Sequence, residues 1–369
     1  MKILFTSPYS LLPMNSGGAV RTLNIGKAMA RLGHEVHVLG AGPVNTDHVL
    51  QHIQVHEFAA AGRFGHFSNR DFRHILEQLL ADEMDLVVVG FPFQAWMVLP
   101  LARRYQVPVI YDAHNVEADR FKRMRRPLVA WAVRLAERRL CNEAAGVFTV
   151  SEEDGALLKL VHGSDSMVLA NGVDTQAMAP GRPEVKVLER YGLTTGDYAL
   201  FFGAYDYSPN QEAARFLLND VWPAVRRVLP EPKLALVGRC PKSWMRGENV
   251  VVTGAVDDLV SLIRGARVVL APLFSGGGTR LKIVEALSCG KTLLATPFGS
   301  RGIFDRDSEA LHLASAEQFA VRLIELLQQV AADPCGNKAA RQLAKSYDWQ
   351  LQVESVMPRL LEIVANGNH

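Results

Sequence analysis

Two separate runs of short apolar strands, each alternating with helices, constrain the fold of this chain more than any other feature of its sequence. The first run opens with a strand at residues 2–5, a polar loop through Gly17 and Gly18, a helix over residues 19–32 and a strand at residues 35–39. Strand, loop, helix and strand in this order make one βαβ unit. Further apolar strands are predicted at residues 85–89, 109–111 and 146–150.

The same pattern restarts in the second half of the chain. Strands are predicted there at residues 199–202, 233–237, 250–252, 268–271 and 292–295, with a helix near residues 212–218. The chain has 369 residues, whereas one hydrophobic core rarely grows beyond roughly 250–300 residues. The two runs therefore predict two domains, and Pro180-Gly181-Arg182-Pro183 is the linker candidate between them.

Continuous apolar strands that alternate with helices indicate parallel sheets covered on both faces. The predicted fold is therefore α/β, with two Rossmann-like doubly wound domains facing a central cleft. We expect an N-terminal domain over residues 1–180 and a second domain over residues 181–348. The last helix, over residues 349–369, either closes the second domain or crosses back to the first. Ligands bind beyond the carboxyl ends of the strands in such sheets, so the loops after the strands are the candidate functional segments.

Composition excludes several classes of protein. Apolar residues make up 49% of the chain, which excludes a largely disordered protein, and a formal net charge of +2 gives no overall attraction to nucleic acid. The four scattered cysteines contain no C-x-x-C metal pair and fit a reducing compartment. Because neither a signal peptide nor a spanning apolar run is recognised, we expect a cytoplasmic protein, with contact to a membrane surface left open.

The strongest candidate segment runs from Ser275 to Lys291. Three glycines, Gly276 to Gly278, follow a predicted strand and precede a helix that Thr279 is expected to cap. Such a turn offers backbone N–H groups to phosphate. The alternative interpretation is an ordinary glycine-rich loop ahead of a helix with a charged surface.

Charged side chains in this segment point to the same ligand. Arg280 and Lys282 lie in the first helical turn, where the helix dipole disfavours cations, and a bound diphosphate explains their presence. Glu285 lies two turns from the glycines, where its carboxylate could accept hydrogen bonds from both ribose hydroxyls.

Two loops of the first run carry further candidates. Gly17 and Gly18 open a helix after the first strand, although the full dinucleotide fingerprint is absent and a flexible turn fits equally well. Arg21, near that helix start, indicates an anion close by. Four polar side chains follow the strand that ends at Tyr111: Asp112, His114, Asn115 and Glu117. His114 is the best candidate for contacting a substrate hydroxyl, and the alternatives are a structural histidine and carboxylates that cap the next helix.

Residues 120–139 form a strongly basic region. Leu128, Trp131, Ala132 and Leu135 share one face of a predicted helix there. Basic residues beside an apolar face with a tryptophan can lie on an anionic membrane surface. The alternative is an ordinary packed helix whose charged face is solvated.

Taken together, these segments resemble the GT-B fold retaining glycosyltransferases of family 4. The resemblance runs nearly end to end and rests on residues 17–18, the DAHN loop at 112–115, NGVD at 171–174, VTGAVDD at 252–258 and the glycine-rich helix at 275–291. Residues 203–213 and 276–286 are also similar to a bacterial branch that assembles surface polysaccharide and lipopolysaccharide.

The resemblance implies a hexosyltransferase-type enzyme that moves a sugar from a UDP- or GDP-sugar to a glycan or lipid-linked glycan acceptor in bacterial cell-surface polysaccharide biosynthesis. The donor would bind mainly in the second domain and the acceptor in the first. His114 would hydrogen-bond the donor sugar, while Arg280 and Lys282 would act on the leaving diphosphate. The remaining donor-site residues would be Gly17, Gly18, Gly203, Thr253, Gly254, Val256, Gly277, Gly278, Thr279, Leu281 and Glu285. No cofactor and no divalent metal are expected.

The chain departs from the family pattern at two places. The family has two glutamates eight positions apart, and here Gly277 stands at the first position and Glu285 at the second. The family's Arg and Lys after the first strand of the second domain are absent from residues 203–210, and we hypothesise that Arg280 and Lys282 supply that charge. A nucleotide-sugar epimerase on the same fold and a non-catalytic nucleotide-sugar-binding subunit are the alternative functions, and Gly277 favours the second of them.

Overall fold

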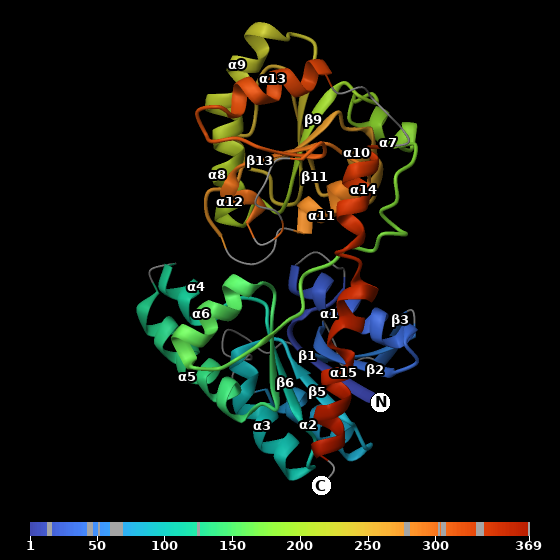
Figure 1. The fold of residues 1–369 in the computed structure, drawn as a ribbon, viewed down its shortest axis with the longest axis vertical. Coiled ribbons are helices and arrows are strands. Elements are labelled where there is room, and N and C mark those ends of the chain that lie inside the picture. The colour runs from blue at the N-terminus through green and yellow to red at the C-terminus, as the bar shows by residue number, and fades with distance from the viewer. Residues whose placement is uncertain are drawn as a thin grey trace. The chain divides into compact units, whose positions relative to one another are not determined.

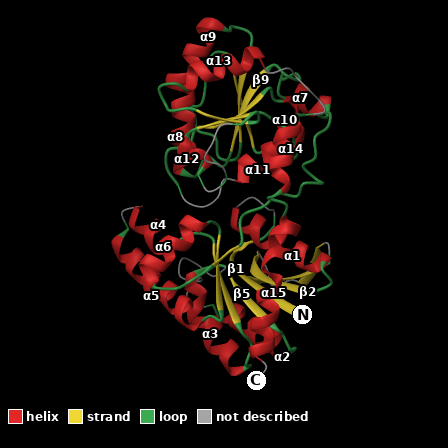
Figure 2. Cartoon of the chain, viewed as in Figure 1, coloured by secondary structure: helices red, strands yellow, loops and turns green. Residues whose placement is uncertain are grey.

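A computed structural model of the chain describes residues 1–12, 17–42, 47–50, 52–59, 69–123, 126–276, 281–301, 303, 308–329 and 336–367. The chain forms two compact units (Figure 1). The first unit contains Met1–Gly172 together with Trp349–His369, and the second contains Val173–Asp348. Each unit has a central sheet with helices on its faces, as Figure 2 shows.

The first unit is built on an eight-stranded sheet with the order β3-β4-β2-β1-β5-β6-β7-β8. Among the strands described for this unit, only β3 runs antiparallel to its neighbour. The strands are β1 (Lys2–Ser10), β2 (Glu35–Gly42), β3 (Asp47–Leu50), β4 (Ile53–Ala59), β5 (Leu86–Val89), β6 (Val109–Ala113), β7 (Gly146–Thr149) and β8 (Met167–Val168). Every residue of β5 and β6 is buried, which explains why these strands read as continuous apolar runs.

Helices cover this sheet, and local sequence signals set several of their ends. The Asn69 side chain accepts a hydrogen bond from the Phe72 N–H at the start of α2, and Ser151 does the same for Asp154 at the start of α6. Gly163, with a φ of 76°, ends α6. The helices are α1 (Gly17–Arg31), α2 (Arg70–Ala81), the short η1 (Pro92–Gln94), α3 (Ala95–Arg104), α4 (Glu117–Arg123), α5 (Pro127–Glu143), α6 (Glu152–His162) and α15 (Trp349–Gly367).

The last helix, α15, packs on the first unit. It lies against α1, and the Ile363 side chain contacts the position of Gly146 at the start of β7. Val353, Leu360 and Ile363 on its inner side are buried. The chain therefore returns to its first unit after it has completed the second.

The second unit is built on a six-stranded parallel sheet with the order β11-β10-β9-β12-β13-β14. Its strands are β9 (Tyr198–Phe202), β10 (Lys233–Val237), β11 (Val250–Gly254), β12 (Val268–Ala271), β13 (Leu293–Ala295) and β14 (Leu311–Leu313). Its helical segments are α7 (Val185–Arg190), α8 (Ser208–Phe216), the π-helical turn η2 (Leu217–Val221), α9 (Trp222–Val228), α10 (Leu259–Gly265), α11 (Leu281–Ser288), α12 (Pro297–Ser300), α13 (Phe319–Gln329) and α14 (Lys338–Lys345). The helix predicted near residues 212–218 is the middle of a longer helical stretch.

The boundary expected at residue 180 lies earlier in the structure, between Gly172 and Val173. The Val173 N–H donates to the Tyr347 carbonyl at 2.8 Å, which joins the start of the second unit to its end. The Arg264 guanidinium donates to the Ala179 carbonyl at 2.9 and 2.7 Å. The Pro- and Gly-rich stretch that reads as a linker is therefore packed on the second unit. Among the described helices, none combines the length and apolar character needed to cross a bilayer.

Adjacent leucines of α15 test its packing. Leu360 is 0% exposed and Leu361 is 51% exposed. Leu360→Ala should destabilise the first unit by about 3 kcal/mol, because it removes buried methyl groups and leaves a cavity. Leu361→Ala, the matched control, should change stability by less than about 0.5 kcal/mol. Thermal and urea unfolding followed by circular dichroism measures both, and equal effects would contradict the packing of α15.

Candidate functional site

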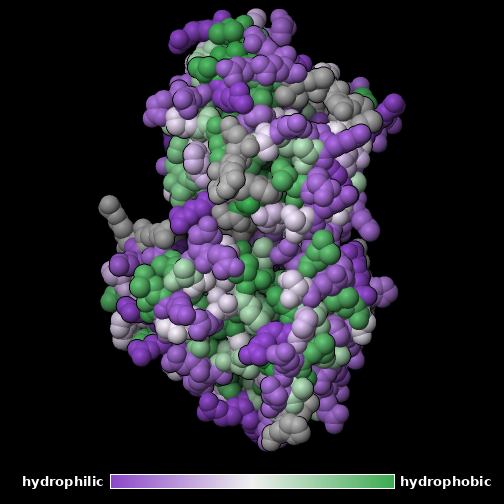
Figure 3. All heavy atoms as spheres, in the orientation of Figure 1, coloured by the Kyte–Doolittle hydropathy of each residue, from purple (hydrophilic) through white to green (hydrophobic). Residues whose placement is uncertain are grey.

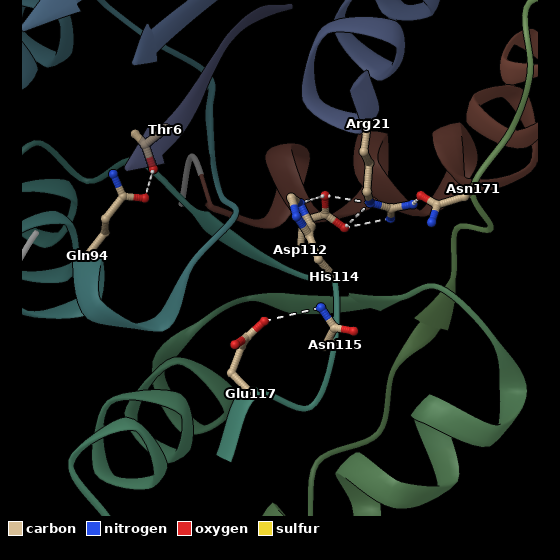
Figure 4. Close-up of polar contacts among 8 residues, drawn as sticks. All are labelled: Thr6, Arg21, Gln94, Asp112, His114, Asn115, Glu117 and Asn171. Carbon is tan, nitrogen blue, oxygen red and sulfur yellow. Dashed lines mark hydrogen bonds and ion pairs between the residues drawn. The ribbon is translucent and has the colours of Figure 1, made fainter. Parts of the chain in front are cut away.

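A buried ion pair lies at the carboxyl end of the sheet in the first unit, as Figure 4 shows. Arg21 of α1 and Asp112 of β6 are both buried. The Arg21 Nε donates to the two Asp112 carboxylate oxygens at 3.1 and 3.0 Å, and Nη2 donates to Oδ1 at 2.6 Å. The anion that the sequence position of Arg21 indicated is therefore a carboxylate of the protein itself.

Two further side chains extend this pair. Arg21 Nη1 donates to Asn171 Oδ1 at 2.9 Å, and Asp112 Oδ2 lies 3.0 Å from His114 Nε2. Burial opposes ionisation of Asp112, but the charge of Arg21 and the hydrogen bond with His114 hold its pKa well below the usual range. Asp112 is therefore a carboxylate at any physiological pH.

The imidazole of His114 is held in a defined orientation. A carboxylate accepts but does not donate hydrogen bonds, so Nε2, which faces Asp112, carries the proton. In the neutral ring Nδ1 is then an acceptor. It lies 3.5 Å from where a Cβ on Gly18 would be, and a Cβ on Gly90 would be 3.4 Å from Nε2. Both glycines therefore lie within van der Waals reach of the ring.

Gly17 and Gly18 are the first two residues of α1. A Cβ on Gly18 would also lie 3.0 Å from the Tyr9 ring, so this position leaves little room for a side chain. The structure thus brings Gly18 and His114, two residues predicted separately from the sequence, next to each other. The first-turn N–H groups of α1 point away from the helix body and can bind an anion.

The other polar residues of the DAHN loop have partners of their own. Asn115 Nδ2 donates to Glu117 Oε1 at 3.2 Å, and Arg120 Nη1 lies 3.0 Å from each Glu117 oxygen. Burial raises the pKa of Glu117, with Arg120 acting in the opposite direction. Nearby, Thr6 Oγ1 donates to Gln94 Oε1 at 3.2 Å (Figure 4).

A residue that the sequence interpretation missed holds the start of α4. Glu137, from α5, accepts hydrogen bonds from the backbone N–H groups of Glu117 and Ala118 at 2.8 and 3.1 Å. It also accepts one from the Tyr111 hydroxyl at 2.9 Å and lies 2.9 Å from His162 Nε2. The cap of this helix therefore comes from the basic region and not from the loop carboxylates. The only hint in the sequence was that Glu137 is an acidic residue between Arg134 and Arg138 in a basic region.

In the second unit, Lys282 of α11 reaches the first turn of α8, the helix that follows the loop after β9. Its ammonium donates to Asn210 Oδ1 at 2.9 Å and lies 4.5 Å from the centre of the Phe201 ring. The Asn210 side chain in turn donates to the Ala204 carbonyl at 2.9 Å. Gly203, with a φ of 154°, has no room for a side chain, because a Cβ would lie 2.8 Å from Asn210 Nδ2. A positive charge therefore lies at the start of α8, within residues 203–210, where the resemblance led us to expect an Arg and a Lys.

Glycines bring neighbouring strand ends together at the same edge of this sheet. A Cβ on Gly238, after β10, would lie 1.9 Å from the Gly203 carbonyl oxygen. The Gly238 N–H donates to the Gly254 carbonyl at 2.9 Å, and Gly254 has a φ of 76°. Thr253 Oγ1 donates to the same carbonyl at 2.8 Å, and Val256 is half-buried against the core. Thr253 and Gly254 thus lie at one edge with Gly203.

Glu285 and Leu281, both on α11, are half-buried. Burial raises the pKa of Glu285 to about 7, and the nearby Lys282 charge acts in the opposite direction. A carboxyl group with this pKa is present in both protonation states near neutral pH, so it can accept or donate a hydrogen bond to a hydroxyl.

Four of the predicted site residues, Gly277, Gly278, Thr279 and Arg280, lie outside the described residues. The same is true of Asp305-Arg306-Asp307. The expectation that no metal is needed assumed that the chain has no D-x-D triplet, and this assumption was wrong, because these three residues form one. Within the part of the chain that the structure describes, no group of three or more His, Cys, Asp or Glu side chains could hold a metal ion.

Two family models match the chain in succession. Glycosyltransferase Family 4 matches residues 15–177, and Glycosyl transferases group 1 matches residues 196–329. The chain belongs to glycosyltransferase family 4. The match confirms the family predicted from the sequence, and the two doubly wound units confirm the GT-B fold.

Curated relatives and solved structures of known proteins are similar to this family member. The phosphatidyl-myo-inositol mannosyltransferase of Mycobacterium leprae is 28% identical over 56% of this chain and 55% of its own length. The phosphatidyl-myo-inositol mannosyltransferase of Mycolicibacterium smegmatis is 23% identical over 100% of this chain and 95% of its own length. This chain thus spans about half the length of the Mycobacterium leprae relative. HepE of Anabaena, solved with UDP and glucose, is 17% identical with a TM-score of 0.73, covering 98% of this chain and 99% of its own.

The His114 tautomer can be measured directly. In protein labelled with ¹⁵N-histidine, the His114 ring should show a protonated Nε2 and an unprotonated Nδ1 at pH values where the ring is neutral, because Asp112 is an acceptor only. Two-bond ¹H–¹⁵N correlation spectra report the tautomer, and the signal missing in His114→Gln assigns the ring. A proton on Nδ1 would contradict the hydrogen-bond geometry described above.

Glu285 should make the free energy of unfolding decrease as the pH rises. Its pKa is about 7 in the folded protein and 4.5 ordinarily, so its favourable contribution is complete below pH 4.5 and is lost as pH rises through 7. Glu285→Gln cannot ionise, so its melting temperature relative to wild type should rise between pH 5 and pH 8, equivalent to roughly 1–3 kcal/mol. Thermal melts at both pH values measure this, with Glu231→Gln as an exposed control in the same unit. A difference that does not change with pH would contradict the burial argument.

Proposed function

We propose that the protein is a retaining hexosyltransferase that moves a sugar from a nucleotide-sugar donor to a glycan or lipid-linked glycan in bacterial cell-surface polysaccharide biosynthesis. The observation that carries the proposal is the Lys282 ammonium, placed beside Asn210 at the carboxyl edge of the second sheet in a family 4 chain. The inferred site of action is the inner face of the cytoplasmic membrane.

Charge on the leaving group is the main demand of this reaction. The bond from the anomeric carbon to the diphosphate oxygen breaks, and negative charge builds on the nucleoside diphosphate. A cation that is already positioned there stabilises this charge without reorganisation. Lys282 is held by a hydrogen bond to Asn210 and by the face of Phe201, so it meets this requirement. Glu285, on the same face of α11, is the proposed ribose ligand.

The acceptor is proposed to bind the first unit. His114 Nδ1, beside Gly18, is an acceptor in the neutral ring and suits a sugar hydroxyl. The named function of the mycobacterial relatives, phosphatidyl-myo-inositol mannosyltransferase, supports mannose as a donor sugar and a lipid as the acceptor carrier to test first. The solved complex of HepE with UDP and glucose likewise supports a UDP-sugar.

Retention is proposed to proceed without a covalent intermediate. Asp112 is bound to Arg21, and Glu117 is bound to Arg120, so neither carboxylate is placed to attack a sugar. The acceptor oxygen would form its bond to the anomeric carbon on the face that the diphosphate leaves, and a phosphate oxygen would take the acceptor proton. The proposal includes no divalent metal, because Arg280 and Lys282 are assigned the role of neutralising the negative charge on the leaving diphosphate.

Donor binding and transfer test this proposal. Among UDP- and GDP-sugars, at least one should raise the melting temperature of the protein, since a ligand bound only to the folded state stabilises it. Lys282→Ala should lower the affinity for that donor roughly ten- to a hundredfold, because the substitution removes a charge-assisted contact. Lys186→Ala, an exposed lysine of the same unit, is the control. Calorimetry gives the affinities.

Activity measurements separate the competing functions. Transfer to a lipid-linked acceptor should survive EDTA and fall sharply in His114→Ala, while affinity for the free nucleotide stays unchanged. Donor binding without transfer would assign the chain a non-catalytic binding role, and a change in the donor sugar without an acceptor would assign it epimerisation. An unchanged donor affinity in Lys282→Ala would contradict the proposed role of this lysine.

A further inference from the structure

Helix α5 has two faces of opposite character. Val133, Ala136 and Leu140 on its inner face are fully buried. On the outer face Leu128 is 84% exposed, Trp131 65% and Leu135 43%. The spacing of three and four residues places these three on one side of the helix. Of the four apolar side chains that the sequence grouped together, these three therefore point away from the core, and the fourth, Ala132, is half-buried.

Three large apolar side chains gathered on one solvent-facing stripe are unusual for a surface that stays in water. Val129, on the same helix, is 36% exposed and adds to this stripe. In Figure 3, hydrophobic residues gather on the side of the first unit where α4 to α6 lie in Figure 1. We call Leu128, Trp131 and Leu135 the outer stripe of α5.

The charges beside the outer stripe are positive. Lys122, Arg126, Arg134 and Arg138 are exposed. Arg134 and Arg138 form no ion pair with any carboxylate in the described part of the chain. Of the two glutamates on α5, Glu137 is buried, and Glu143 is engaged by Arg103 at 3.0 Å and Arg139 at 2.8 Å.

This combination matches the headgroup region of an anionic bilayer. Leucine and tryptophan side chains partition into the boundary between headgroups and acyl chains. Arginines flanking them are attracted by anionic lipid and can keep their charged ends in the headgroup layer. An acidic protein groove would also take arginines, but it would not favour a tryptophan and a leucine exposed on a convex helix.

The outer stripe lies at the end of the first unit where acceptor chemistry is proposed. β6 ends at Ala113 and α4 starts at Glu117, both at the carboxyl edge of the sheet, and α5 then runs back toward the start of β7. The first half of α5 is therefore at the same edge as His114. Glu137 joins α5 to α4 by accepting hydrogen bonds from the backbone N–H groups of Glu117 and Ala118.

We infer that the outer stripe of α5 docks the first unit on an anionic lipid bilayer, with Arg134 and Arg138 in the headgroup layer. Docking itself rests on the exposed residues alone. The consequence that the acceptor reaching His114 is carried by the same bilayer rests on the proposed function. A bound membrane surface at this edge would hold a lipid-linked acceptor near the loop without any long protein arm.

Flotation of the full chain with vesicles tests the docking. Wild type should float with vesicles that contain phosphatidylglycerol and much less with phosphatidylcholine alone. The variant Leu128→Ser/Trp131→Ser/Leu135→Ser should lose this binding, whereas Val321→Ser/Leu361→Ser, which removes two other exposed apolar side chains, should keep it. Arg134→Gln/Arg138→Gln should lower the partition coefficient about fivefold per arginine and weaken its salt dependence.

The outcomes separate docking from catalysis. Loss of flotation in the stripe variant, with an unchanged melting temperature and donor affinity, supports the inference. Wild-type protein that binds neither vesicle, or a stripe variant that floats as well as wild type, overturns it. A wild-type dimer that becomes a monomer in the stripe variant, without vesicle binding, also overturns it and makes this face an interface between copies. Vesicle binding without any sugar transfer leaves the docking intact and defeats only the proposed function.

Discussion

The ion pair between Arg21 and Asp112 is the interaction on which the first unit's candidate site depends. It joins α1 to β6, and the remaining guanidinium nitrogen fixes Asn171 just before the chain leaves the unit. Burying two charges is costly unless their geometry is good and their other polar atoms are also bonded. Here three N–H groups and both carboxylate oxygens are used, and one of those oxygens also holds His114. The same contacts that secure the fold therefore orient the imidazole.

The second unit positions its charge in a different way. Lys282 donates to the amide oxygen of Asn210, and a neutral amide positions an ammonium group without cancelling its charge. Gly203 is required for this contact because any side chain there would occupy the place of the Asn210 amide. Glu285, one turn further along α11, is held in a setting that disfavours its ionised form. A rigid charge and an adjustable carboxyl group thus share one helix.

The sequence predicts the two α/β units and the family because strand and helix periodicity and the spaced motifs are local properties. The partners of Arg21 were beyond reach, since Asp112 is 91 residues away and only the folded sheet brings it close. A cation near the start of α1 is disfavoured by the helix dipole, so the position of Arg21 indicated a nearby anion but did not identify it. The boundary failed for a similar reason: Pro180 and Gly181 have the composition of a linker, yet Gly290 packs on Pro180 and Arg264 on Gly181.

Helix α5 shows most clearly what periodicity leaves open. Helical spacing tells which residues share a face, but Leu128, Trp131 and Leu135 fit equally a face turned inward and one turned outward. The deciding residue is Glu137, which lies opposite that stripe and is fully buried with four hydrogen-bond partners. A carboxylate with so many partners fixes which side of the helix faces the core. Because two of those partners are the first N–H groups of α4, which starts three residues after His114, the outer stripe and the His114 loop belong to one hydrogen-bonded body within the first unit.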